Sequence, residues 1–125
     1  MDEEFLNSKI EKIQKILNPP PTKISIYFVN NKVIRSLNKK FFKKDSPTDV
    51  ISFKYSPNYG EIVLSIEECG KNAQIYSHTL EEEIIYVIIH GILHLKGFRD
   101  YNIKEKRKMF TIQDRIFEKV MKNEK

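Results

Sequence analysis

The most constraining segment of this chain is the apolar run from Ile84 to Leu95, which would form a helix with hydrophobic residues on nearly every side. A helix that is apolar all round must be buried, so we expect it in the middle of the domain. Thr79 is a suitable N-cap, with Glu82 three residues on as its capping-box partner. The sequence therefore predicts a central helix that begins after Thr79 and ends near Leu95.

Two histidines, His90 and His94, interrupt this run four residues apart and therefore share one helix face. Gly97 can adopt the left-handed turn that ends the helix, after which the chain can fold back and bring Asp100 to the same point. Two imidazoles and a carboxylate suit Zn²⁺ and leave a fourth position open for water, as in catalytic sites. Nickel or another divalent ion would fit the same ligands, and two structural core histidines are the alternative.

The spacing His-x3-His-x2-Gly-x2-Asp also matches the metal-binding pattern of the metzincin proteases, with aspartate as the last ligand. Zinc proteases place a glutamate, the general base, directly after the first histidine, but this chain has Gly91 there. Glycine cannot accept a proton and lowers helix stability, so its presence indicates close approach of another backbone or of substrate. A peptidase is therefore the less favoured interpretation.

Hydrophobic periodicity divides the rest of the chain into short helices and strands. It predicts further helices at 4–17, 32–42, 67–76 and 103–121, and strands at 23–30, 49–55 and 61–66. The first helix should stop at Asn18-Pro19-Pro20-Pro21, because the residue before a proline avoids the helical region. The turn residues at 56–60 predict an antiparallel hairpin between the last two strands.

The composition is that of one globular domain over residues 1–125, with 40% hydrophobic and 31% charged residues. The N-terminus is acidic where a signal peptide would be basic, and no apolar run is long enough to span a bilayer. We therefore expect a cytoplasmic location. Cys69 is the only cysteine, which excludes an internal disulfide, and we expect it to be a small half-buried residue.

The chain is basic, with 22 Lys and Arg against 17 Asp and Glu, a net charge of +5 and a pI near 9.2. This charge suits a polyanionic partner such as RNA without proving one. The basic run at 104–108 is expected to be a solvated helix face, and His78, before the Thr79 cap, is expected to be solvated.

Three segments resemble the YbeY family, bacterial rRNA maturation factors described as endoribonucleases. Residues 90–100 resemble the family motif His-Gly-x-Leu-His-Leu-x-Gly-Tyr-x-x. Residues 45–53, preceded by Asn38 and Phe41, resemble its Pro-Thr-Asp-Val-Leu-Ser-Phe segment, and residues 60–62 resemble its Gly-Asp-Ile. The resemblance extends over about residues 24–120.

This resemblance implies an α+β fold, in which a small mixed sheet packs with about four to five helices and the histidine helix lies across it. It implies a zinc-like ion held by His90, His94 and Asp100, the last in a place where the family usually has histidine. Aspartate adds a negative charge, which should make the metal less electrophilic. It further implies cleavage of single-stranded RNA, maturation of rRNA ends such as that of 16S rRNA, and a link to ribosome assembly.

Two other departures from the family pattern affect the expected catalysis. Phe42 stands where family members often carry arginine, and Glu61 replaces the usual aspartate of Gly-Asp-Ile. In place of that arginine, nearby lysines could hold the RNA backbone, although each acts only as a point charge: Lys39, Lys40, Lys43 and Lys44.

Further residues are candidates for proton transfer and for base stacking. Asp49 and Glu61 are candidate proton acceptors, with turn capping or a surface ion pair as the alternative. Four aromatic residues could stack RNA bases or belong to the core: Tyr27, Phe41, Phe42 and Phe98. The expected partners are rRNA and ribosomal particles, with neither DNA nor a membrane among them. A metal-stabilised assembly factor that no longer cuts RNA is the alternative to a nuclease.

Overall fold

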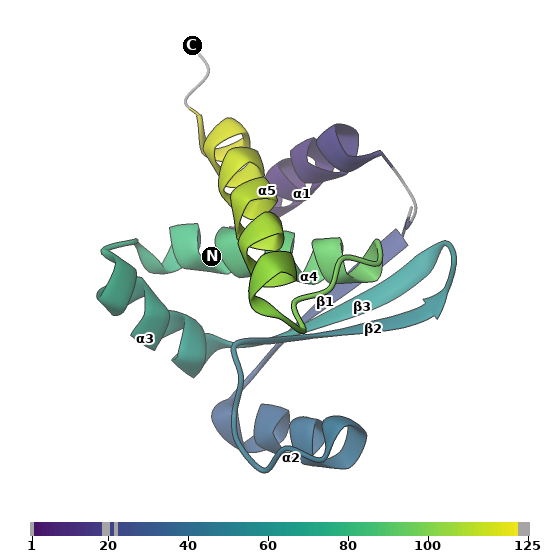
Figure 1. The fold of residues 1–125 in the computed structure, drawn as a ribbon. Helices are drawn as coiled ribbons and strands as arrows, with labels where there is room; N and C mark the ends of the chain where they lie inside the picture. The colour runs from purple at the N-terminus through teal and green to yellow at the C-terminus, as the bar shows by residue number, and fades with distance from the viewer. Residues whose placement is uncertain (1, 19–20, 22, 123–125) are drawn as a thin grey trace.

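The computed structural model describes residues 2–18, 21 and 23–122 as five helices and three strands (Figure 1). In chain order they are α1 (Glu3–Leu17), β1 (Lys23–Val29), α2 (Asn31–Phe42), β2 (Val50–Ser56), β3 (Tyr59–Ser65), α3 (Ile66–Tyr76), α4 (Leu80–Leu95) and α5 (Ile103–Met121). Every element was expected from the sequence, and each end lies within two residues of its expected position. The helix α1 ends as predicted, although Pro19 and Pro20 of the expected stop lie outside the described residues.

The three strands form one mixed sheet in the order β1-β3-β2. The strands β2 and β3 pair antiparallel, which confirms the predicted hairpin, whereas β1 runs parallel to β3. Because side chains alternate along a strand, Ser52 and Ile62 point to one face of the sheet and Phe53 and Glu61 to the other. We call the face that carries Phe53 and Glu61 the outer face.

The helix α4 lies across the inner face of the sheet, as predicted, and is covered on its other sides by α1, α3 and α5 (Figure 1). Ten of its sixteen residues are buried, and its start has the expected capping box between Thr79 and Glu82. Its side chains form the main core with Ile62 and Leu64 of the sheet and with Met109 of α5. The histidine motif is therefore part of a helix that is mostly buried.

The helix α2 lies alone on the outer face of the sheet (Figure 1). Beneath it is a second, smaller core cluster formed by Ile34, Ile51 and Val63, with Phe53 packed against it. The far end of the β2-β3 hairpin extends beyond α2, so the outer face there has no covering helix among the described residues.

Three expectations about single features can be compared with the structure. The side chains of Lys104, Lys106, Arg107 and Lys108 are exposed, which confirms the solvated face of α5. Cys69 is fully buried instead of half-buried, and this burial raises the pKa of its thiol to about 12. Among the described helices, none has both the length and the apolar character needed to cross a bilayer.

Truncation of α4 at its centre should destabilise the whole protein. Ile88 is fully buried, so Ile88→Ala should lower the free energy of unfolding by about 2–5 kcal/mol in urea titrations. The matched control is Ile75→Ala on α3, where the side chain is 69% exposed. That variant should stay within about 0.5 kcal/mol of the original protein, and similar losses in both would contradict a core centred on α4.

Candidate metal centre

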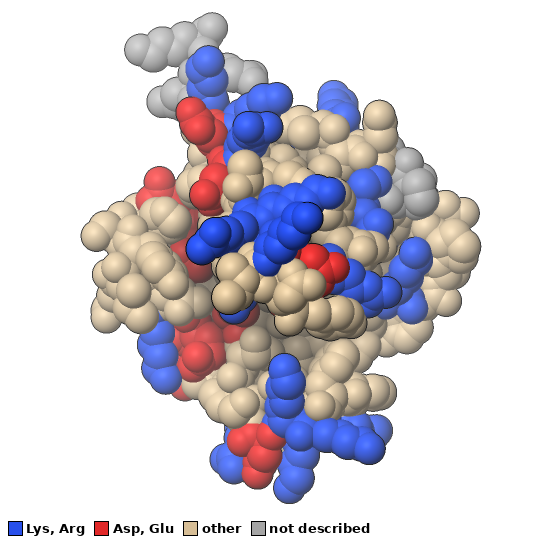
Figure 2. Space-filling model, in the orientation of Figure 1, with Lys and Arg blue, Asp and Glu red and all other residues tan. Residues whose placement is uncertain are grey.

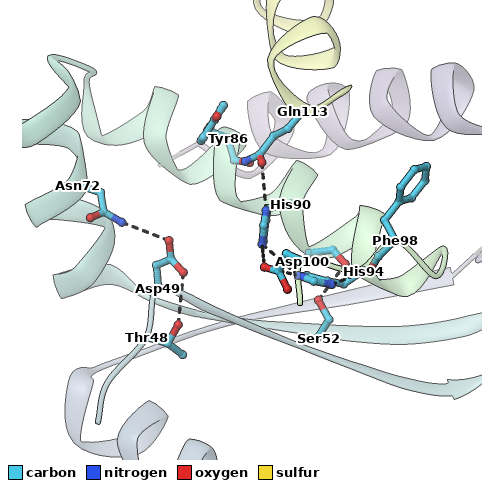
Figure 3. Close-up of polar contacts among 11 residues, drawn as sticks. Thr48, Asp49, Ser52, Asn72, Tyr86, His90, His94, Phe98, Asp100 and Gln113 are labelled. Atoms are coloured by element: carbon cyan, nitrogen blue, oxygen red, sulfur yellow. Dashed lines mark hydrogen bonds and ion pairs between the residues drawn. The ribbon is translucent and has the colours of Figure 1, made fainter. Parts of the chain in front are cut away.

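Three ligand atoms from α4 and the following loop meet at one point (Figure 3). The Nε2 atoms of His90 and His94 are 3.1 Å apart, and Oδ2 of Asp100 lies 3.7 Å from the first and 3.6 Å from the second. The chain reaches this position through Gly97, whose φ of +100° is the left-handed turn expected after the helix. The structure thus brings together the three residues that the sequence singled out as ligands.

The triangle formed by these atoms has the size of a metal site. A tetrahedral ion with ligand bonds of roughly 2.0–2.1 Å holds its ligand atoms roughly 3.3–3.4 Å apart. The observed separations of 3.1, 3.6 and 3.7 Å lie on either side of that value. The residues therefore fit a divalent ion with only small side-chain movements.

Hydrogen bonds on the far side of each imidazole set which nitrogen faces the cluster. Nδ1 of His94 donates to the carbonyl of Phe98 at 3.0 Å, and Nδ1 of His90 donates to Oε1 of Gln113 at 3.0 Å. The amide of Gln113 cannot turn around, because its Nε2 donates to the carbonyl of Tyr86 at 3.0 Å. Both Nε2 atoms therefore present lone pairs to the same point, and a cation between them would remove their mutual repulsion.

Gln113 contacts the candidate metal centre, although the sequence did not single it out. It is 1% exposed and lies on α5 between the buried residues Met109 and Ile116. A polar side chain on the apolar face of an amphipathic helix needs a buried hydrogen-bond partner, so the position of Gln113 in the sequence already indicated that such a partner exists. The partner became identifiable only when α5 was placed against α4.

The environment also keeps His94 in the form that binds metals. Burial lowers the pKa of His94, and the positive charge of a protonated His90 lowers it further, whereas the nearby Asp100 carboxylate raises it. A lowered pKa favours the neutral imidazole, which is the state that coordinates metal ions.

Gly91 lies where α4 meets the sheet most closely. A Cβ atom at this position would be 3.0 Å from Oγ of Ser52 and 3.2 Å from two side-chain atoms of Ile62. The hydroxyl of Ser52 donates to the carbonyl of Gly91 at 2.8 Å (Figure 3). The expected close approach exists, but it is made by side chains of β2 and β3, and neither another backbone nor a substrate is needed to explain it.

The cluster opens into a cavity of about 790 Å³ between α4, α5 and the start of β2. Asp49 lines the same cavity as the three ligands, with its carboxylate held by Asn72 at 3.2 Å (Figure 3). Burial raises the pKa of Asp49, and the charge of His90 opposes this increase. Of the two expected proton acceptors, Asp49 is therefore the one that shares a cavity with the cluster.

His78 lines the far end of this cavity and is not a solvated residue as expected. Its Nδ1 lies 3.0 Å from the buried Glu83 carboxylate, and its ring contacts Tyr86 and Phe117. The prediction that His78 is solvated was wrong because its partner Glu83 faces inwards. The sequence places Glu83 in the acidic first turn of α4, where side chains are usually exposed.

A second hollow, of about 720 Å³, meets the first at His94 and Asp100. Its lining includes three cations and two exposed aromatic rings: Lys44, Lys54, Arg99, Phe42 and Tyr101. Figure 2 shows Lys and Arg side chains over α5 and over α2, with a hollow between them. We call this second space the basic hollow.

Of the four lysines expected to bind RNA, only Lys44 lines the basic hollow. Lys39 lies 4.0 Å from the Asp45 carboxylate, and the ammonium of Lys40 lies 5.3 Å from the ring centre of Phe41. Lys43 is the exposed C-cap of α2, with a φ of 57°. The structure therefore does not bring these lysines together at the cluster.

Glu61, the other expected proton acceptor, lies on the outer face of the sheet and not in either hollow. Its carboxylate accepts hydrogen bonds from Tyr59 at 2.8 Å and Tyr27 at 3.4 Å. The expectation fails because β3 alternates its side chains, which puts Ile62 towards α4 and Glu61 on the opposite face. The sequence could not show which face would carry the site.

Comparisons with known proteins agree with this architecture. The family model described as Endoribonuclease YbeY matches residues 2–121. The chain belongs to the YbeY family. A protein named Endoribonuclease YbeY from Endomicrobium trichonymphae is 41% identical over 111 residues, which are 87% of this chain and 74% of the relative.

Further relatives extend the family likeness to nearly the whole chain. The protein of the same name from Persephonella marina is 37% identical and matches 94% of this chain and 82% of its own length. A solution structure of a Thermotoga maritima protein has a TM-score of 0.66 and 32% identity, and covers 94% of this chain and 81% of that one. The likeness to this family thus extends over nearly the whole chain and includes the fold.

Loss of the Gln113 hydrogen bond should weaken metal binding without removing a ligand. Gln113→Leu frees the His90 ring to turn, so the affinity for a divalent ion should fall by about 10- to 100-fold in calorimetric titrations. Thr111→Ala on the exposed side of α5 is the control and should bind the ion as before. Unchanged affinity in Gln113→Leu would show that His90 is not a ligand held in this tautomer.

Proposed function

We propose that this protein is a metal-dependent endoribonuclease that cuts single-stranded rRNA during ribosome assembly, including the maturation of ends such as that of 16S rRNA. The main support is the triangle of His90, His94 and Asp100 atoms, in which both imidazoles present Nε2 to one point beside an open cavity. Membership of the YbeY family supports the RNA substrate. Ribosomal particles are the proposed partners and the cytoplasm is the proposed location.

Zn²⁺ is the ion that we propose for this site, because two imidazoles and one carboxylate match its catalytic ligand sets. A bound divalent ion lowers the pKa of a coordinated water towards ~7 and polarises a phosphate oxygen. His90 and His94 would hold it through Nε2, and Asp100 through one carboxylate oxygen. The Asp100 charge would make the site a milder Lewis acid than one with three histidines.

Asp49 is the proposed proton acceptor for the attacking water. It lines the same cavity as the ligands, and its raised pKa makes the carboxylate a stronger base than an exposed aspartate. Asn72 holds the carboxylate in place at 3.2 Å.

The basic hollow is the proposed binding place for the RNA phosphates next to the cleaved bond. Lys44, Lys54 and Arg99 line it together with His94 and Asp100, so their charges lie on this side of the cluster. The cavity of about 790 Å³ on the other side of the cluster is lined by acidic groups, among them Asp49 and Asp114, which would repel phosphates. The strand would therefore approach the cluster from the basic hollow.

Two features favour the second candidate function, a metal-stabilised assembly factor without nuclease activity. Phe42 lines the basic hollow where many family members have arginine, and Asp100 stands in place of a histidine ligand. A peptidase has less support, because Gly91 stands where zinc proteases have the glutamate base, and Ser52 and Ile62 crowd that position.

Cleavage should depend on the metal ligands. His94→Ala should lose both the bound Zn²⁺, measured by atomic absorption, and the cutting of single-stranded RNA, because the two remaining ligands cannot hold the ion tightly. Asp100→His is the matched control and should keep the metal and cut at least as fast, since it removes a negative charge from the site.

Three outcomes would decide between the candidates. Equal RNA cleavage by His94→Ala and the original protein would exclude this site as the nuclease centre. A metal-loaded protein that binds ribosomal particles and cuts no RNA would favour the assembly factor. Cleavage of a casein substrate that His94→Ala abolishes would favour the peptidase.

Removal of the proposed proton acceptor should slow the chemistry and leave the metal bound. Asp49→Asn should lower kcat by about a hundredfold to ten-thousandfold. In the original protein, activity should fall as the pH drops through the raised pKa of Asp49, because a protonated carboxyl cannot accept a proton. Asp114→Asn in the same cavity is the control, and an equal loss of kcat there would show a general charge effect.

A further inference from the structure

A continuous row of aromatic side chains crosses the outer face of the sheet beside α2. The ring centres of Phe41 and Phe53 are 5.1 Å apart, those of Phe42 and Phe53 6.3 Å, and those of Phe53 and Tyr55 6.4 Å. Tyr55 then stacks on Tyr59 at 5.8 Å with an interplanar angle of 25°. We call these five residues the aromatic row.

The aromatic row is open to solvent over much of its length. The side chains of Phe41, Phe42 and Tyr55 are 52%, 49% and 62% exposed, and α2 covers only the part of the outer face nearest to Phe53. Single exposed aromatic residues are ordinary in proteins, but a contiguous exposed apolar patch usually marks a binding surface.

The rings are also held in place, which suits a binding surface. Phe53 packs against the cluster beneath α2. The Tyr59 hydroxyl donates to Glu61 at 2.8 Å and lies 3.1 Å from Oγ of Ser25, while Tyr27 donates to the same carboxylate at 3.4 Å. The Glu61 that the sequence suggested as a base therefore acts as an anchor for tyrosine rings.

The aromatic row begins at the proposed catalytic site. Phe42 lines the basic hollow together with His94 and Asp100, and its ring neighbours Phe53 on the outer face. Because β2 is an edge strand of the sheet, a chain can pass from the hollow around this edge to the row. Lys54, between Phe53 and Tyr55 in sequence, lines the hollow on the other side of the same strand.

Positive charge accompanies the row at both ends. The ammonium of Lys40 lies 5.3 Å from the ring centre of Phe41, and Lys23 of β1 pairs in register with Tyr59. Lysines beside exposed rings are the arrangement with which proteins hold single-stranded nucleic acid, since phosphates meet the cations and bases stack on the rings.

We propose that the aromatic row is a stacking platform for the bases of a single-stranded RNA whose cleaved phosphodiester lies at the His90–His94–Asp100 cluster. The inference rests on the proposed nuclease function and adds how the enzyme holds the strand beyond the cut. Stacking uses the π-face that every base has, so the platform would bind RNA without regard to sequence. A second copy of this chain is a poorer occupant, because it would bring the flanking lysines of two molecules together.

The test compares two substitutions that differ only in the ring. Tyr55→Leu removes the aromatic ring and keeps an apolar side chain, whereas Tyr55→Phe keeps the ring. With the metal-loaded protein and an RNA of about 12 uridines, Tyr55→Leu should raise KM by about 5- to 150-fold and leave kcat unchanged. Tyr55→Phe should behave like the original protein.

A substrate control separates stacking from other effects. The same strand with abasic residues beside the cut keeps its phosphates, so Tyr55→Leu and Tyr55→Phe should cut it with equal KM. Equal KM values for the two variants on the intact RNA would overturn the platform while the nuclease function stands. If the original protein cuts neither strand, both proposals fall.

Discussion

The structure depends on burying one helix on nearly every side while two histidines lie at the edge of its buried surface. Within the core around α4, the Nδ1 atoms of His90 and His94 find acceptors in Gln113 and in the Phe98 carbonyl. An imidazole without a partner in such a place would cost roughly 1–3 kcal/mol. The packing that stabilises the domain therefore also orients both Nε2 atoms, and the fold and the candidate metal site follow from the same contacts.

The sheet has a different role on each of its faces. Its inner face supports α4 so closely that a Cβ atom at position 91 would lie 3.0 Å from Oγ of Ser52, which donates a hydrogen bond to the helix there. Its outer face carries a small core under α2 and, beyond it, the exposed aromatic rings. The edge strand β2 joins the two faces, since Lys54 lines the basic hollow and Tyr55 belongs to the aromatic row. A strand only 7 residues long thus separates the chemistry proposed at the cluster from the RNA binding proposed on the outer face.

The departures from the family pattern at positions 42 and 100 both make the local charge around the cluster more negative. Asp100 adds a negative charge to the ligand set, and Phe42 removes a positive charge from the neighbouring hollow. Both changes weaken attraction for a phosphodiester at the cluster. Lys44, Lys54 and Arg99 supply cations in the same hollow, so electrostatic attraction there does not depend on an arginine at position 42.

The amino-acid sequence alone predicted the elements, the central position of α4 and the meeting of His90, His94 and Asp100, because these follow from local spacing: periods of 3.6 and 2 residues, and an i, i+4 pair followed by a glycine turn. It could not separate Asp49 from Glu61, since both stand near the start of a strand. Only the tertiary structure placed Asp49 in the cavity, Glu61 among tyrosines and Gln113 behind His90. The physical reason is that the face a side chain occupies depends on strand register and helix packing, which join residues far apart in the chain.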